Sequence, residues 1–181
     1  MFIIISGCSG SGKNTLINEL LNRNPKLKFL KSCTTRQTVR QEEIKNPLYI
    51  KLSRQEFEDK INKGEFFEYE EIHGYYYGTL NSTIDDLISG KNDYIKDLGV
   101  LGQKAMVERL GHKTKIVSIF LDVPKDELMK RLELRGEKNI EKRMARYDFE
   151  VSHRPNFNLI IPNDNMQKTV KIIERILKNE A

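Results

Sequence analysis

Consecutive hydrophobic positions occur in a few short runs that are spaced along the chain. Residues 2–5 (FIII), 93–98 (DYIKDL) and 115–123 (KIVSIFLDV) are the clearest, and residues 28–35 (KFLKSCTT) and 158–161 (NLII) are weaker. Unbroken apolar runs rich in β-branched residues are typical of strands that are buried on both faces of a parallel sheet. The pattern therefore predicts β-strands at these five places.

Between these runs, apolar residues recur with the spacing of an amphipathic helix. Residues 13–22, 99–110 and 166–178 are predicted helices, and Pro124 suits the first turn of a further helix, because its missing N–H costs little there. The helix at 99–110 lies between two predicted strands and completes a β–α–β unit. Strands that alternate with helices predict an α/β fold with a parallel sheet and helices on both faces.

Residues from about 36 to 85 differ from the rest of the chain. They are polar, rich in tyrosine and glutamate, and lack a long apolar run. Ser53 and Glu56 have the spacing of a capping box, which predicts a helix over residues 53–63. We expect one domain that consists of a core and one insertion. The expected ranges are 1–181 for the domain, 1–35 and 86–181 for the core, and about 36–85 for the insertion.

Composition and charge narrow the class of protein. The 181 residues are 38% hydrophobic, which suits one globular domain. The net charge of +5, without a run of basic residues, argues against a nucleic-acid partner and suits a pocket for phosphates. Two cysteines, Cys8 and Cys33, make no disulfide framework, so we expect a cytoplasmic protein. No run approaches the about 18 apolar residues of a membrane span, and MFIII is too short for a signal peptide.

A glycine-rich loop, SGCSGSGKNTL at residues 6–16, directly follows the first predicted strand. Its glycines let the backbone wrap around an anion, and its N–H groups and the following helix N-terminus point at phosphate oxygens. Lys13 adds a positive charge for the β- and γ-phosphates. The residues expected to bind a nucleoside triphosphate here are Gly7, Cys8, Ser9, Gly10, Ser11, Gly12, Lys13, Asn14 and Thr15.

Asn14 departs from the usual loop, in which a serine or threonine follows the lysine and ligates Mg²⁺. The carbonyl oxygen of an asparagine is also a hard donor. Three outcomes are open: Asn14 binds the metal directly, holds it through water, or marks a site that no longer catalyses. We favour the first two, because the charge of the metal mostly bridges phosphates.

Four further stretches follow the loop in order along the chain. They are SCTTR at 32–36, EFFEYEEIHGYYYGT at 65–79, RLELRG at 131–136 and PND at 162–164. Together with the loop they resemble the guanylate kinase family over almost the whole chain, and the TTR and tyrosine-rich elements are the most specific. The resemblance implies a P-loop kinase that transfers the γ-phosphate of ATP to GMP or dGMP, in line, without a covalent intermediate and with Mg²⁺.

The resemblance also implies which residues hold GMP. The residues at the positions that read the base in the family are Ser32, Glu68 and Thr79. The residues at the positions that hold the acceptor phosphate are Arg36, Arg40, Tyr49 and Tyr77. A carboxylate can accept from both N1–H and the N2 amine of guanine, an arrangement that adenine does not offer. The arginine fork and the tyrosine hydroxyl both suit phosphate oxygens.

Two departures from the family pattern fall in this region. Val39 stands where the second arginine is usual, and we expect a one-residue insertion to return Arg40 to that place. Asp97 matches the first of two aspartates that the family typically spaces by one residue, but Gly99 stands in place of the second. Asp97 is still expected to orient metal-bound water or the acceptor, and the missing carboxylate is expected to loosen substrate binding.

The RLELRG element resembles the start of the lid of the family, expected here at about residues 135–145. The lid arginines would neutralise charge on the phosphoryl oxygens in the transition state. The set with expected catalytic roles is Lys13, Arg36, Arg131, Arg135 and Arg143. Asn163 matches a residue near the adenine of ATP, but an Asx-turn is an equal interpretation.

Two alternatives to a guanylate kinase remain open at this point. The first is a related kinase with another acceptor, such as ribose 1,5-bisphosphate, since ribose 1,5-bisphosphate phosphokinase resembles this family and accepts a non-hydroxyl residue after the loop lysine. Ser32 and Glu68 argue against it, because a sugar phosphate offers nothing to a carboxylate that reads guanine. The second is a non-catalytic binding module, since a fold alone does not fix a function. The sequence leaves a monomer or a homodimer open.

Overall fold

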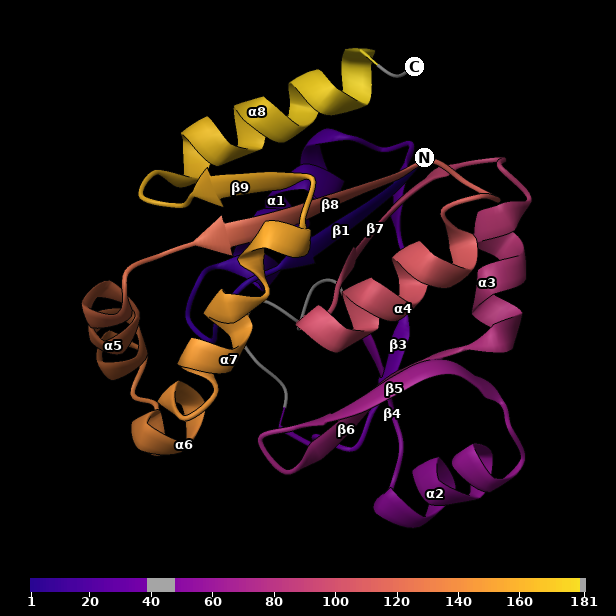
Figure 1. Ribbon diagram of the computed structural model, residues 1–181, viewed down its shortest axis with the longest axis horizontal. Helices are drawn as coiled ribbons and strands as arrows, with labels where there is room; N and C mark the ends of the chain where they lie inside the picture. The colour runs from indigo at the N-terminus through magenta and orange to yellow at the C-terminus, as the bar shows by residue number, and fades with distance from the viewer. Residues whose placement is uncertain (39–47, 180–181) are drawn as a thin grey trace.

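The computed structural model describes residues 1–38 and 48–179, and they contain two β-sheets (Figure 1). The central sheet has five strands in the order β2-β7-β1-β8-β9, all of them parallel. Its strands are β1 (Phe2–Ser6), β2 (Leu27–Phe29), β7 (Asp93–Asp97), β8 (Ile116–Asp122) and β9 (Leu159–Pro162). The parallel sheet predicted from the apolar runs is therefore confirmed.

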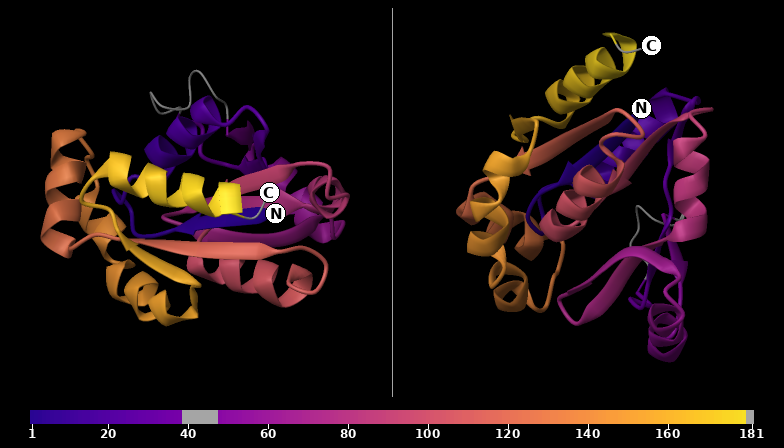
Figure 2. Two further views of the ribbon diagram at one scale, coloured as in Figure 1. Left: turned by 90° about the horizontal axis from the view of Figure 1, so that it is seen from above. Right: turned by 45° about the vertical axis from the view of Figure 1, so that its right-hand side comes forward.

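Helices cover both faces of this sheet, as the alternation of elements predicts. In β1, Ile3 and Ile5 belong to one buried cluster and Phe2 and Ile4 to another. The first cluster includes side chains of α1 (Lys13–Arg23) and α8 (Met166–Asn179), and the second includes those of α3 (Asn81–Ile88) and α4 (Val100–Leu110). Figure 2 shows α1 and α8 on the opposite side of the strands from α4.

The second sheet has four strands in the order β4-β3-β6-β5. They are β3 (Ser32–Thr34), β4 (Tyr49–Lys51), β5 (Phe66–Ile72) and β6 (Tyr75–Leu80). The helix α2 (Arg54–Asn62) packs on it through Phe57, whose ring stacks between Phe66 and Tyr76 at centroid distances of 4.2 and 5.1 Å. The capping box predicted at the start of this helix is confirmed: the Ser53 hydroxyl accepts from Glu56 N–H, and the Glu56 carboxylate accepts from Ser53 N–H.

A third group of elements lies beyond the carboxyl end of β8. It comprises α5 (Lys125–Leu134), α6 (Ile140–Met144), α7 (Tyr147–Ser152) and a 3₁₀ turn (Arg154–Asn156). Leu128, Leu132 and Met144 pack with Cys8 of the glycine-rich loop and Phe120 of β8 in one buried cluster. These helices are thus anchored beside the loop.

Two details of the sequence-based prediction are wrong. Residues 28–35 form two strands in different sheets, because Leu30 N–H donates to Ile95 O in the central sheet and Ser32 then pairs with Tyr49 in the second. Pro124 lies one residue before its helix, with φ −57° and ψ 146°. The second sheet consequently begins at Ser32, before the boundary expected at about 36.

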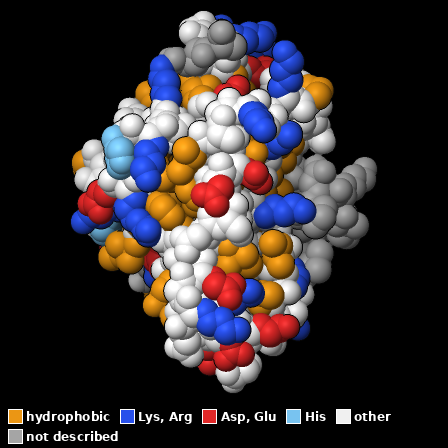
Figure 3. All heavy atoms as spheres, turned by 90° about the vertical axis from the view of Figure 1, so that its right-hand side faces the viewer, with side chains coloured by type: hydrophobic (Ala, Val, Ile, Leu, Met, Phe, Trp, Pro, Cys, Tyr) orange, Lys and Arg blue, Asp and Glu red, His pale blue; other side chains and the backbone are white. Residues whose placement is uncertain are grey.

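Two surface properties bear on possible partners. On the face shown in Figure 3, acidic and basic side chains are interspersed and hydrophobic ones lie between them. Among the described residues, no helix combines the length and the apolar character that a membrane crossing requires.

Replacing Phe57 with alanine tests whether the stacked rings hold the second sheet to α2. Phe57 is fully buried, so Phe57→Ala is expected to lower the free energy of unfolding by about 3–5 kcal/mol, since it removes a large side chain and leaves a cavity. Denaturant unfolding of the purified protein measures this. Leu134→Ala is the control, because Leu134 is 90% exposed and its loss should change stability by less than about 0.5 kcal/mol. Equal effects of the two changes would contradict the expectation.

Candidate active site

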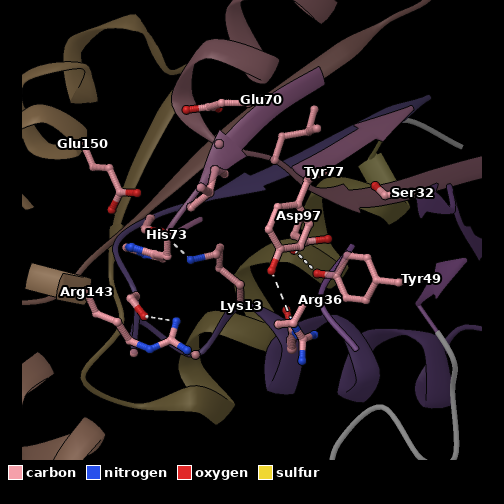
Figure 4. Close-up of a pocket in the computed structure, with 18 of the residues that line it drawn as sticks. Lys13, Ser32, Arg36, Tyr49, Glu70, His73, Tyr77, Asp97, Arg143 and Glu150 are labelled. Atoms are coloured by element: carbon pink, nitrogen blue, oxygen red, sulfur yellow. Dashed lines mark hydrogen bonds between the residues drawn. The ribbon is translucent and has the colours of Figure 1, made fainter. Parts of the chain in front are cut away.

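One cavity of about 370 Å³ is lined by the carboxyl edge of the central sheet, the second sheet and the helices after β8 (Figure 4). Ligands of open α/β sheets bind at this edge. Sixteen of the residues expected at the site from the sequence line this cavity: Gly7, Ser9, Gly10, Gly12, Lys13, Asn14, Thr15, Ser32, Arg36, Tyr49, Glu68, Tyr77, Asp97, Arg131, Arg135 and Arg143.

The glycine-rich loop runs from the end of β1 to the start of α1. Lys13 donates from Nζ to the carbonyls of Gly7 and Cys8, so its ammonium is held across the mouth of the loop. Gly12 has φ +95°, and a Cβ there would lie 2.9 Å from Nδ2 of Asn163. Only glycine fits this position, since both the conformation and the close approach exclude a side chain. The loop therefore offers an ammonium and a helix N-terminus to an anion.

Asn163 holds this loop in place through hydrogen bonds. Its Nδ2 donates to the carbonyl of Ser11 at 2.7 Å, and its Oδ1 accepts from the Thr169 hydroxyl at 2.8 Å. The side chain is buried and does not line the cavity. These long-range bonds differ from a local Asx-turn and position the loop. The expected place of Asn163 near adenine stays a prediction.

Oxygen donors suited to a hard cation lie next to Lys13. Asn14 is 7% exposed and lines the cavity, and Thr15, one residue later, does so as well. Oδ1 of Asp97 is buried and accepts no hydrogen bond from any described residue, whereas Oδ2 accepts from the Tyr49 hydroxyl at 2.5 Å. Amide and carboxylate oxygens are what Mg²⁺ prefers. In the described part of the chain, no group of three His, Cys, Asp or Glu forms a complete metal site.

Arg36, Tyr49 and Tyr77 form a second place for an anion. The Arg36 side chain is nearly buried, its Nε donates to the Tyr77 hydroxyl at 3.2 Å, and its guanidinium lies 5.7 Å from the ring centre of Tyr49. The two tyrosine rings pack edge to face at 5.9 Å. Figure 4 shows this group with Asp97 on one side of Lys13 and Arg143 on the other.

The residues expected to read a base lie on strands of the second sheet, close to Lys96 of the central sheet. Glu68 of β5 accepts from the buried Thr79 hydroxyl of β6, and Ser32 of β3 accepts from the ammonium of Lys96. Burial raises the pKa of Glu68, and Lys96 opposes that shift. Burial also lowers the pKa of Lys96, and Glu68 and Asp97 oppose it. The two opposite charges therefore support each other's ionised form inside the protein.

Three arginines approach the loop from the helices after β8. Arg131 donates to the Asn163 carbonyl at 3.0 Å, and Arg143 reaches the Ser9 hydroxyl at 3.4 Å. Arg143 also pairs with Glu137 at 2.5 Å, and Arg135 lies 3.7 Å from the same carboxylate. Glu137 thus holds two of the guanidinium groups where both line the cavity.

Four residues of the site were missed by sequence reasoning. Lys96 is fully buried, and a lysine inside an apolar strand is the signal that could have found it. Glu70 and His73 line the cavity from the tyrosine-rich element and Glu150 lines it from α7, but nothing in their local sequence marked these three as site residues. Burial and the charges of Arg143, Arg146 and Lys13 lower the pKa of His73 to about 4, so its imidazole is neutral at pH 7. Burial raises the pKa of Glu150.

Some expected site residues do not line the cavity. Cys8 and Ser11 belong to the loop, but their side chains are buried, so what they offer an anion is backbone. Burial and nearby Glu150 raise the pKa of the Cys8 thiol to about 12. Thr79 does not line the cavity, and its hydroxyl donates a hydrogen bond to the Glu68 carboxylate. Arg40 lies outside the described residues, as does Val39.

Two anion-binding groups thus border one cavity that has a partly buried carboxylate at one end. One group surrounds Lys13 and the other contains Arg36. Such an arrangement can hold two phosphate-bearing molecules side by side and stabilise charge that moves between them.

Known proteins with similar sequences and structures share this arrangement of elements. The sequence model of a family described as "Guanylate kinase" matches residues 1–180. Curated guanylate kinases of Prochlorococcus marinus and Clostridium tetani are 36% and 34% identical over 98% and 99% of this chain, and the matches cover 96% and 86% of the relatives.

Solved structures agree with the sequence comparison. The crystal structure of guanylate kinase from Anaplasma phagocytophilum matches with a TM-score of 0.75 at 25% identity, covering 99% of this chain and 85% of that chain. Shikimate kinase from Aquifex aeolicus matches with a TM-score of 0.53 at 15% identity, which shows the fold alone. The sequence matches extend over nearly the whole chain, and the glycine-rich loop, the second sheet and the helices after β8 meet at one cavity. The chain belongs to the guanylate kinase family.

Proposed function

We propose that this protein transfers the γ-phosphoryl group of ATP to GMP or dGMP, giving ADP and GDP or dGDP. The observation that carries the proposal is the position of Glu68, a partly buried carboxylate in the same cavity as Arg36 and the Lys13 loop. Family membership gives the reaction, and this carboxylate gives a reason for guanine as the acceptor base.

The base is selected by groups on both sheets. Glu68 accepts hydrogen bonds from N1–H and the N2 amine of guanine, while the Thr79 hydroxyl holds this carboxylate in place and Lys96 opposes the rise in its pKa that burial causes. Ser32 meets the base with its hydroxyl oriented by Lys96. Adenine presents an unprotonated N1 and no N2 amine to Glu68, so AMP would supply no donor to add to the Thr79 hydroxyl, and the partly buried carboxylate would lose the two hydrogen bonds that guanine makes.

Phosphoryl transfer needs positioning and positive charge more than acid–base chemistry. Arg36, Tyr49 and Tyr77 hold the GMP phosphate, and Lys13 with the loop N–H groups holds the β- and γ-phosphates of ATP. The lid arginines, Arg131, Arg135 and Arg143, stabilise charge on the transferred group. Arg40 is proposed to join the acceptor clamp from outside the described residues.

Mg²⁺ fits the donors beside Lys13, with Asn14 as a direct or water-mediated ligand and Asp97 Oδ1 as an acceptor for a coordinated water. When bound with ATP, the ion neutralises phosphate charge and fixes the geometry of the triphosphate. The carbonyl oxygen of Asn14 therefore replaces the hydroxyl that usually follows the loop lysine.

Two parts of the chain are proposed to close on the substrates. They are the GMP-binding insertion, about residues 36–85 together with β3, and the lid at about 135–145. Their closure excludes water and limits wasteful hydrolysis of ATP. The cytoplasmic location and the lack of a nucleic-acid partner stay predictions, and a monomer and a homodimer are both open.

The proposed reaction predicts a narrow choice of acceptor. ADP release with ATP·Mg²⁺ is expected with GMP and dGMP, and not with AMP, UMP, CMP or ribose 1,5-bisphosphate, because only guanine supplies both donors to Glu68. A coupled assay with this panel measures it. Turnover only with the sugar phosphate would favour the first alternative, and ATP binding without any turnover would favour a non-catalytic module.

Removing the charge of Glu68 tests the assignment of the base site. Glu68→Gln is expected to lower kcat/KM for GMP by about a hundredfold or more, since the amide keeps only one acceptor without charge and turns a donor toward the donors of guanine. The KM for ATP should stay within about twofold, because the triphosphate lies at the other end of the cavity. Glu71→Gln is the matched control: Glu71 lies on the same strand but is exposed. A loss of the same size in both variants would refute the assignment.

Changing Asn14 to serine tests the metal assignment. Asn14→Ser restores the usual hydroxyl, so kcat is expected to stay the same or rise, with the KM for GMP nearly unchanged. Titration of activity with Mg²⁺ should give an equal or lower half-saturating concentration. A correctly folded Asn14→Ser protein without activity would show that Asn14 does something other than serve the metal.

A further inference from the structure

Two carboxylates of β5 face the first turn of α4. Glu68 and Glu70 lie two residues apart on the strand, so they share a face. Opposite them, Gly99 and Gly102 lie three residues apart at the start of the helix, so they also share a face. A Cβ at position 102 would lie 3.0 Å from Oε2 of Glu68, and a Cβ at position 99 would overlap Oε2 of Glu70. The glycines make room for the carboxylates.

The Glu70 side chain is 10% exposed and lines the cavity. Its Oε1 accepts from the guanidinium of Arg146, which is the N-cap residue of α7. Its Oε2 is buried and accepts no hydrogen bond from any residue that the structure describes. Buried carboxylate oxygens are rarely left without donors, so this oxygen points to a donor that arrives with a ligand.

Glu70 also supplies a carboxylate at the place where Gly99 has no side chain. The family resemblance predicts a carboxylate at position 99, and its absence was expected to loosen substrate binding. In this chain the carboxylate of Glu70 occupies the space where that side chain would begin. Gly99 is the N-cap of α4 and has no side chain that could cap it. The positive end of the helix therefore favours the charge that Glu70 brings.

We propose that Glu70 is a second reader of the guanine base, which accepts the hydrogen of the N2 amine that Glu68 leaves unpaired. This inference rests on the proposed function. The N2 amine has two hydrogens, and a carboxylate that accepts from N1–H and one of them leaves the other directed away from itself. Arg146 holds Oε1 of Glu70, so Oε2 remains for the base. The carboxylate thus comes from β5 instead of α4.

The proposal is tested with GMP and IMP, because hypoxanthine keeps N1–H and lacks the N2 amine. Calorimetric titration gives the Kd of both nucleotides, and the coupled assay gives turnover with GMP. Glu70→Ala is expected to raise the Kd for GMP by about tenfold to a hundredfold and that for IMP by less than about twofold. Glu71→Ala, on the exposed face of the same strand, should change neither.

Equal weakening of GMP and IMP in Glu70→Ala would overturn the proposal, because it would indicate a general effect on the pocket. Absence of GMP turnover in the unchanged protein would overturn the proposed function as well. Thermal unfolding checks each variant. If Glu70→Ala does not fold, Glu70→Gln is measured in its place, because it keeps the size and one acceptor for Arg146 and should still lower the preference for GMP over IMP.

Changes at position 99 test whether a carboxylate there can take the place of Glu70. Gly99→Asp alone is expected to weaken GMP binding, because its side chain meets Glu70. The double variant Glu70→Ala/Gly99→Asp should recover most of the preference for GMP that Glu70→Ala loses. A double variant no more selective than Glu70→Ala would overturn the claim that the two positions supply the same carboxylate.

Discussion

The parallel pairing of β1 with its two neighbours is the constraint on which the site depends. Ile5 pairs with Asp97 of β7, and Ser6 pairs with Phe120 of β8. All three strands therefore end at one edge of the sheet. The glycine-rich loop follows β1 there, Asp97 is the last residue of β7, and the chain after β8 leads to α5. A shift in this register would separate Lys13 from Asp97 and from the arginines, although every local motif would remain intact.

Buried carboxylates near this edge of the sheet are paired with buried or partly buried cations. Lys96 of the central sheet reaches Ser32 of the second sheet and stabilises Glu68, while Arg146 neutralises Glu70. Each of these two carboxylates thus has a cation beside it. The protein can keep two anionic acceptors close together and still admit a nucleotide that carries negative charge of its own, because the arginines and lysines lie where the phosphates are proposed to bind.

Local sequence patterns predicted the central sheet and the phosphate loop, because strands buried on both faces are continuously apolar and the loop chemistry is contained in one short segment. The strands β4, β5 and β6 of the second sheet were read only as a polar insertion, since most of their residues are partly exposed, and the three buried residues of β3 were read as the end of a core strand. Glu70 and Glu150 could not be found from the sequence alone, because their places in the cavity arise from contacts with distant elements. Family resemblance supplied Ser32 and Glu68, but it could not show that Glu70 fills the space beside Gly99.

The two buried cysteines can report, through their reaction with a thiol reagent, when the segment around each of them opens. Cys8 packs under α5 and the lid, and Cys33 lies inside the second sheet, with exposures of 3% and 1%. The raised pKa of each thiol keeps it protonated at neutral pH, so a disulfide reagent reacts only when the surrounding segment opens. The rates at which the two thiols are modified therefore measure how often each half of the molecule opens, without any introduced label.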